Sequence, residues 1–220
     1  MRYIKFLNET NVDDVVELIK QKCQPFLKEW DGNNFLYRGM KHSFTYDIKQ
    51  VRVDRKPKDI PLILHEMLDK EFKKQFGWNA RSNSVFCTGN KTSTEEYGNA
   101  YVIFPCDNYK YISSEKVEDL YLHLLRWETT KSSLYKNHFE KTIYNKQSIL
   151  DNYRLYYDDY MFLPKLELFF KDLVKTYTNR NLNRLILVGN EILINCKQYI
   201  AIREIDINEK EFLRKILWDI

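Results

Sequence analysis

Four of the six glycines in this 220-residue chain stand next to side chains that can bind a ligand. The segments are Tyr37-Arg38-Gly39, Phe86-Cys87-Thr88-Gly89, Tyr97-Gly98 and Gly189-Asn190-Glu191. Glycine at the end of a strand or helix permits a positive φ, or lets a ligand approach the backbone closely. The neighbouring groups are an arginine fork suited to phosphates or hydroxyls, a hydroxyl, aromatic rings and a carboxylate. Their order along the chain predicts one ligand site assembled from four short segments.

The positive charge of the chain is concentrated in one quarter of its length. The formal net charge is +4, with 35 Lys and Arg against 31 Asp and Glu. Residues 38–91 alone hold 12 Lys and Arg against 6 Asp and Glu. This excess indicates an anionic partner, either the phosphates of a small ligand or a nucleic-acid backbone. A solvated basic surface is the alternative that charge alone leaves open.

The composition is that of a folded protein, with 44% apolar and 30% charged residues. No apolar run approaches the ~20 residues that cross a bilayer. Acidic residues interrupt the first segment before an apolar signal sequence can form, so we expect a cytoplasmic protein with no membrane partner. The four cysteines and four histidines are scattered along the chain. We therefore expect no metal site, and cysteines that are buried as small apolar residues.

Apolar periodicity and turn residues predict an irregular alternation of helices and short strands. Helical spacing is found at 11–30, 61–76, 92–97, 114–127, 165–177 and 208–218. Short apolar or alternating runs predict strands at 35–39, 84–88, 99–104, 185–188, 191–195 and 199–205. Residues 43–53 are expected to form a strand or extended chain, and residues 107–113 a strand or a turn. Because these elements lack regular βαβ alternation, they predict an α+β fold. We expect one domain over residues 1–220, with a mainly helical insert at about 114–180.

The four glycine segments resemble the motifs of the ADP-ribosyltransferase superfamily. Members carry a first-strand Arg or His followed by Gly, as in Arg38-Gly39 here, and a second strand that ends in Ser or Thr, as at Thr88. A short helix with an aromatic residue and a Glu that opens a late strand follow, as at Tyr97 and Glu191. The resemblance covers residues 35–200. It implies a split, twisted β-sandwich with flanking helices and with NAD bound in the cleft.

The resemblance also assigns a role to each matching residue. Arg38 would hold the diphosphate or a ribose hydroxyl of NAD, and the backbone of Gly39 would meet the nicotinamide carboxamide. Thr88 would bind the ribose or orient the glutamate. Tyr97 and Phe86 would stack on the nicotinamide ring. Each residue also has a purely structural alternative, such as an ion pair for Arg38 or a strand-end position for Thr88.

Glu191 is the expected catalytic residue. Departure of nicotinamide leaves an oxocarbenium-like positive charge on the ribose, which a nearby carboxylate stabilises. The predicted activity is NAD-dependent mono-ADP-ribosyl transfer to a macromolecule, with NAD hydrolysis as a variant. Arg52, Arg55 and Arg81 are candidates for contacts with phosphates or with the acceptor. The alternative is an ordinary edge-strand carboxylate at Glu191.

As the expected acceptor, nucleic acid is slightly favoured over protein. Toxin-type members that modify arginine carry a second Glu two positions before the catalytic one, and here that position is Gly189. The resemblance to this branch implies a bacterial or phage effector or toxin, for which an antitoxin is a candidate partner. Two other functions remain open: a non-enzymatic, basic nucleic-acid-binding module, and a degenerate transferase fold that acts as a scaffold.

Overall fold

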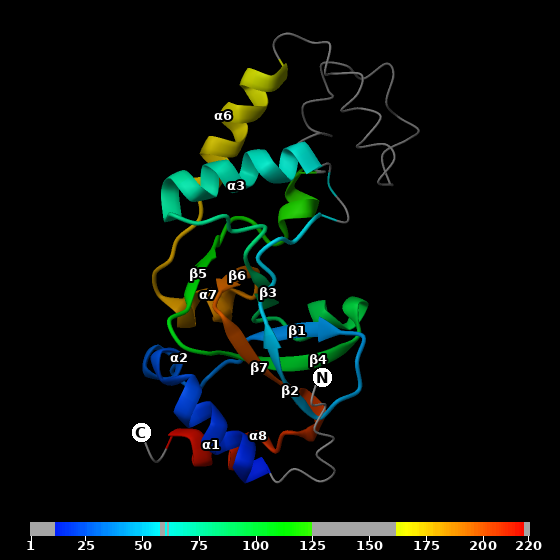
Figure 1. Cartoon of the computed structure of the whole chain (residues 1–220), viewed down its shortest axis with the longest axis vertical. Helices are drawn as coiled ribbons and strands as arrows, with labels where there is room; N and C mark the ends of the chain where they lie inside the picture. Colours follow the sequence, from blue (N-terminus) through cyan, green and yellow to red (C-terminus); the bar gives the residue numbers. More distant parts are fainter. Residues whose placement is uncertain (1–11, 58–59, 61, 125–161, 218–220) are drawn as a thin grey trace, which may run out of the picture.

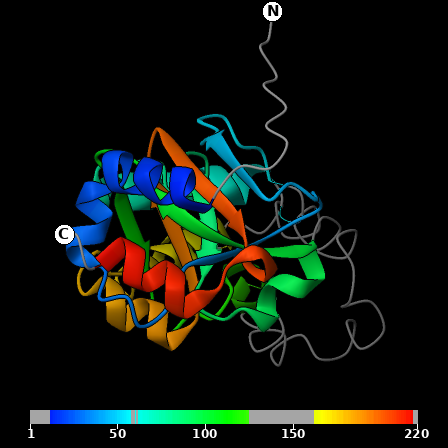
Figure 2. The same ribbon diagram turned by 90° about the horizontal axis from the view of Figure 1, so that it is seen from below.

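The computed structural model describes residues 12–57, 60, 62–124 and 162–217. The fold is of the α+β kind, with one antiparallel sheet and helices at both ends of the molecule (Figure 1). Helices α3 (Leu62–Phe76) and α6 (Phe162–Val174) lie at one end. Helices α1 (Val12–Lys22) and α8 (Glu209–Leu217) lie at the other, where they pack against each other (Figure 2).

Seven strands form the sheet in the order β2-β7-β4-β1-β3-β6-β5, and each neighbouring pair is antiparallel. Their bounds are β1 Tyr37–Met40, β2 Tyr46–Gln50, β3 Val85–Thr88, β4 Asn99–Pro105, β5 Lys110–Ser113, β6 Glu191–Asn195 and β7 Gln198–Arg203. The central junction is narrow, because β1 and β3 are paired at Tyr37 and Thr88 alone. The sheet therefore consists of two well-paired halves, β2-β7-β4-β1 and β3-β6-β5, which separate beyond this point.

Two hydrophobic cores pack against the sheet and lie on opposite faces of β6. The first packs α1, α2 (Gln24–Glu29), α7 (Leu182–Val188) and α8 against the strands, and the second packs α3 and α6 against β5 and β6. Strand β6 shows the alternation that this requires: Ile192 and Ile194 enter the first core, and Leu193 enters the second. Successive side chains of a strand point to opposite faces. All four cysteines are buried, as predicted.

Local sequence explains where several elements begin and end. Pro25 lacks an N–H, so the helix expected over residues 11–30 stops at Lys22 and restarts as α2. The 3₁₀ helix η1 (Thr92–Tyr97) ends at Gly98, whose φ of 124° favours glycine. A second 3₁₀ turn, η3 (Glu204–Asp206), follows β7.

The strand predicted at residues 185–188 is wrong, because these residues belong to helix α7. Asn181 caps the helix by accepting a hydrogen bond from the backbone N–H of Arg184 at 3.3 Å. Gly189, with φ at 80°, ends it. The apolar residues Leu182, Leu185 and Ile186 are buried on one face, with the spacing of a helix. Both caps lie in the sequence, but the short apolar run resembles a strand when read alone.

The expected helical insert at 114–180 is only partly helical in the described residues. Residues 120–124 form a helical segment, whereas residues 114–119 are non-helical and follow β5. Helix α6 begins three residues before the predicted start at Lys165 and ends at Val174. Residues 125–161 of the expected insert lie outside the described residues. Strand β1 begins at Tyr37 rather than at Phe35, so Arg38 and Gly39 lie within the strand.

Candidate active site

A cavity of about 360 Å³ opens where the two halves of the sheet separate. All but one of the nine residues singled out from the sequence line it: Arg38, Gly39, Arg55, Arg81, Phe86, Thr88, Tyr97 and Glu191. The strand register explains this convergence, because Tyr37 is paired with Thr88 and Thr88 is paired with Glu191. Segments separated by 150 residues in the chain are thus adjacent across three strands.

Glu191 is the first residue of β6 and is fixed at both of its backbone groups. Its N–H donates to the carbonyl of Glu118 at 2.8 Å, and its carbonyl accepts from the Ser113 hydroxyl at 2.8 Å. The carboxylate Oε1 lies 3.1 Å from Nη1 of Arg81, and the side chain is 14% exposed. Burial raises the pKa of Glu191, while the charge of Arg81 opposes that rise and the charge of Asp119 adds to it.

Three guanidinium groups gather around Phe86 in the wall of this cavity. The guanidinium carbons of Arg55 and Arg81 lie 3.6 and 4.6 Å from the centre of the Phe86 ring. Nη1 of Arg38 donates to the Phe86 carbonyl at 2.8 Å. The ring of Phe86 is thus a platform for two arginines, an arrangement that cation–π attraction stabilises. The stacking of Phe86 on nicotinamide that the family resemblance implied stays a prediction.

The electrostatics of this arginine group favour a bound anion. Burial, together with the charges of Arg38 and Arg81, lowers the pKa of Arg55 to about 10, although the charge of Glu191 opposes this. The Nε atoms of Arg38 and Arg81 are buried and have no hydrogen-bond partner among the described residues. Buried, unpaired donors and repelling like charges are both costly, and an anion with several oxygens would relieve both.

Thr88 fixes the loop that leads into Glu191. Its hydroxyl donates to the carbonyl of Gly189 at 2.5 Å and accepts from the backbone N–H of Asn90 at 3.0 Å. These bonds connect the end of β3 to the residue that ends α7. The following residue, Gly89, packs so closely that a Cβ there would lie 1.7 Å from the carbonyl oxygen of Ile186. Thr88 therefore acts on Glu191 indirectly, by holding its loop.

Gly39 allows η1 to lie directly on β1. A Cβ at Gly39 would lie 2.3 Å from the carbonyl oxygen of Thr94 and 2.6 Å from Cβ of Tyr97. This packing places Tyr97, which is 59% exposed, at the cavity. Because β1 pairs with β3 only at Tyr37, its edge beyond that residue has no strand partner within the described residues. The backbone at Gly39 thus borders the cavity.

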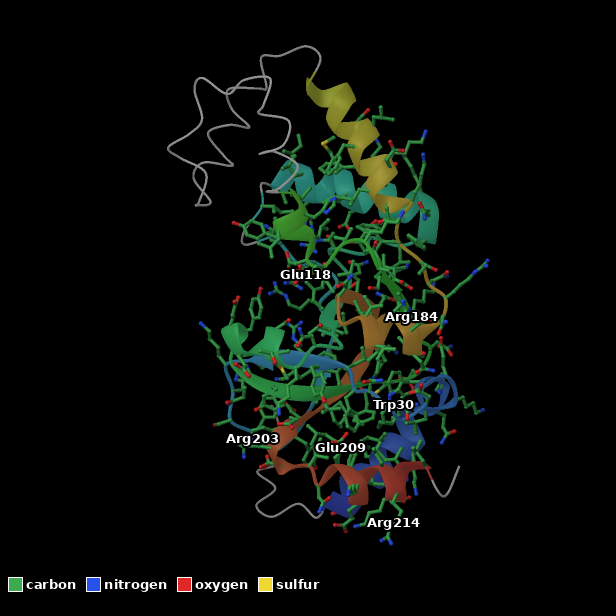
Figure 3. The ribbon with its side chains drawn as sticks, turned by 180° about the vertical axis from the view of Figure 1, so that it is seen from behind. Trp30, Glu118, Arg184, Arg203, Glu209 and Arg214 are labelled. Atoms are coloured by element: carbon green, nitrogen blue, oxygen red, sulfur yellow. The ribbon has the colours of Figure 1, made fainter. Side chains whose placement is uncertain are left out.

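Arg52 is the predicted residue that the structure places elsewhere. Its side chain is 71% exposed, and its Nε lies 3.8 Å from a carboxylate oxygen of Asp54. The cavity instead includes Glu118 and Asp119, which the sequence analysis did not single out. Glu118 lies between α3 and β1 in Figure 3. No motif marks these two carboxylates, since they follow β5 in a segment whose spacing predicted helix.

A second, polar cavity of about 280 Å³ adjoins the first. The two share Glu118, Asp119 and Gly189. The second is lined further by Asn90, Asn190, Glu115, Lys116, Val188 and His123. A group that enters this second cavity therefore contacts the loop that leads into Glu191, at Gly189 and Asn190.

Neither a metal nor a membrane segment is indicated by the described part of the chain. It contains no group of three or more His, Cys, Asp or Glu residues arranged to hold a metal ion. None of its helices combines the length and the apolar character needed to span a bilayer.

Comparisons of the chain with protein-family models, with curated proteins and with solved structures each found no match.

Proposed function

We propose that the protein is an NAD-dependent mono-ADP-ribosyltransferase that releases nicotinamide and transfers ADP-ribose to a macromolecular acceptor. The observation that carries this proposal is the convergence of Arg38, Tyr97 and Glu191 on one cavity, from segments far apart in the sequence. The proposal includes the fold implied by the family resemblance. A sheet whose halves join at the single pair Tyr37 and Thr88 is compatible with a split β-sandwich.

The arginine group supports a dinucleotide as the ligand. The diphosphate of NAD carries two negative charges and several oxygens that accept hydrogen bonds. Arg38, Arg55 and Arg81 offer three guanidinium forks in one wall, with the carboxylate of Glu191 beside them. The volume of about 360 Å³ is within the range of small-molecule sites. We assign the diphosphate to this wall and the nicotinamide to the side of Gly39 and Tyr97.

Glu191 then has the position and environment that the chemistry needs. The bond between nicotinamide and the ribose breaks with its electron pair going to nicotinamide, and positive charge develops on the sugar. A carboxylate with 14% exposure interacts with that charge through little water. The positive charge of Arg81 favours the ionised form and so opposes the rise in pKa that burial causes. An acceptor group supplies the new electron pair to the sugar carbon and gives up a proton.

The placement of charges also bears on the acceptor. Three of the basic residues in segment 38–91 line the cavity. The excess of positive charge in this segment is therefore partly explained without a nucleic-acid partner. The carboxylates of Glu118 and Asp119 lie where an acceptor would approach through the second cavity. This favours an acceptor that carries hydrogen-bond donors, such as an amine, a guanidine or the amino group of a base.

The test is incubation of the purified protein with labelled NAD and a whole-cell lysate. Samples treated afterwards with nuclease or with protease identify whether the labelled acceptor is nucleic acid or protein. Release of nicotinamide without labelled product indicates hydrolysis. If the wild type releases no more nicotinamide than the Glu191→Gln variant, the proposal is wrong. A basic nucleic-acid-binding module would instead bind nucleic acid with an affinity that falls by ~10³ or more between 50 and 200 mM salt.

A further inference from the structure

A buried polar cluster lies behind the arginine wall, between α3 and the turn that precedes β3. His65 and Asp69, one helical turn apart on α3, are only 3% and 6% exposed. They meet Ser82, which lies in that turn directly after Arg81. Burying a carboxylate is costly unless hydrogen bonds satisfy it, so the contacts of Asp69 indicate what it is held there to do.

The carboxylate of Asp69 holds the turn by its backbone. Oδ1 accepts from the N–H of Arg81 at 2.6 Å, and Oδ2 accepts from the N–H of Ser82 at 3.1 Å. The Ser82 hydroxyl donates to Oδ2 at 2.5 Å. Hydrogen bonds to a charged acceptor are stronger than bonds between neutral groups. One bond to Arg81 and two to Ser82 thus fix the turn from which the Arg81 side chain reaches Glu191.

The same turn also holds a second cavity arginine. The carbonyl of Ser82 accepts from the backbone N–H of Arg55 at 3.2 Å. Asp69 thus fixes Arg81 directly and Arg55 through Ser82, and these are the two guanidinium groups that cover the Phe86 ring. A single carboxylate on α3 therefore helps to position both arginines.

His65, Ser82 and Asp69 are the residue types of a hydrolase triad, but the direction of their hydrogen bonds excludes that role. Because the Ser82 hydroxyl proton goes to Asp69, His65 Nε2 must donate to the Ser82 oxygen, 2.9 Å away. In a catalytic triad the histidine accepts the serine proton, and its other nitrogen binds the carboxylate. Here both partners lie on the Nε2 side, and Nδ1 is buried without a partner among the described residues.

We propose that Asp69 is a positioning residue for a diphosphate-binding site: it fixes the turn at Arg81 and Ser82 so that Arg81 and Arg55 face the phosphates of the substrate. The effect on turnover rests on the proposed function, whereas the effect on phosphate binding does not. A carboxylate that served only to stabilise the fold would leave the affinity of the folded protein for phosphates unchanged.

The experiment compares Asp69→Asn with the matched control Glu71→Gln. Glu71 is on the same helix and its side chain is 14% exposed, but it pairs with Lys74. The affinity of the full-length protein for inorganic pyrophosphate is measured by calorimetry, well below the melting temperature of each variant. We expect Asp69→Asn to weaken binding by about tenfold or more, the equivalent of one charge-assisted hydrogen bond. Glu71→Gln should bind like the wild type.

Turnover of NAD provides the second readout through a double-mutant cycle. If Asp69 acts through Arg81, the loss of kcat caused by Asp69→Asn should be much smaller in the Arg81→Ala background. Equal losses in both backgrounds would contradict the proposal. If the wild type binds pyrophosphate in an Asp69-dependent way but does not turn over NAD, the positioning role stands and the proposed function fails.

Two further outcomes decide the remaining cases. If Asp69→Asn does not fold, Ser82→Ala replaces it, since that variant removes the hydroxyl bond and keeps both backbone bonds to Asp69. We then expect pyrophosphate affinity to fall by about threefold or more. Unchanged affinity in the folded variants, or no pyrophosphate binding by the wild type, overturns the assignment.

Discussion

Replacing Glu191 with Gln removes one charge and leaves the shape of the side chain in place. The backbone bonds to Glu118 and Ser113 do not involve the side chain, so strand β6 should keep its start. An amide oxygen can still accept a hydrogen bond from Arg81, which now lies 3.1 Å from the carboxylate. We therefore expect the variant to fold and to bind NAD.

The expected loss of turnover follows from the burial of the carboxylate. For two opposite charges about 4 Å apart, an effective dielectric constant of about 20 gives about 4 kcal/mol. Arg81 offsets part of this attraction, because its positive charge lies 3.1 Å from the same oxygen. A remaining ~3 kcal/mol of transition-state stabilisation corresponds to a rate about a hundredfold lower in the variant.

The assay is nicotinamide release at saturating NAD, with NAD affinity measured separately. Glu71→Gln is the matched control, since the side chain of Glu71 is also 14% exposed but pairs with Lys74 on α3, outside both cavities. The control should release nicotinamide at the wild-type rate. If Glu191→Gln also does so while it binds NAD normally, the carboxylate has no role in the chemistry and the reasoning is refuted.

Four further results are expected. Gly39→Ala should destabilise the fold by about 1–3 kcal/mol and weaken NAD binding, because its Cβ would overlap Thr94; thermal unfolding and calorimetry check this. Arg55→Ala should raise KM for NAD more than it lowers kcat, since Arg55 lies over Phe86 in the phosphate wall, whereas the arginine that pairs with Glu191 is Arg81; equal changes in both would contradict that role. Burial raises the pKa of Glu191 above its ordinary 4.5 and Arg81 opposes this, so Arg81→Ala should move the acid limb of the activity profile to higher pH. For the same reason, the stability of the wild type relative to Glu191→Gln should be greatest below pH 4.5 and fall as pH rises through the pKa of the folded protein, as melting temperatures across pH would show.

Much of the candidate site was predictable because its residues mark the ends of elements. Arg38, Thr88 and Glu191 belong to short segments that each contain a glycine, and the antiparallel register of β1, β3 and β6 then brings these segments together. The bounds of the strands around them were predicted to within two or three residues. The exception is residues 185–188, which were predicted as a strand but belong to helix α7. There a run of four apolar residues suggested a strand, while the helical face depends on Leu182, which lies before that run.

The groups that support the site were not predictable from sequence patterns. Asp69 lies on the buried side of α3, and its partners are backbone N–H groups that any residue other than proline supplies. Asp119 reaches the cavity through the position of a loop after β5. The contacts of Arg55 and Arg81 with the Phe86 ring bring together two segments far from each other in the sequence. Such contacts are set by tertiary packing.

The most direct measurement is a crystal structure of the Glu191→Gln variant with NAD. The account predicts NAD in the cavity between the halves of the sheet, with its diphosphate on Arg55 and Arg81. The ribose carbon that bears nicotinamide should face the side chain at position 191, with the nicotinamide beside Gly39 and Tyr97. NAD bound elsewhere, or with its diphosphate toward Tyr97 and its ribose away from position 191, would contradict the account.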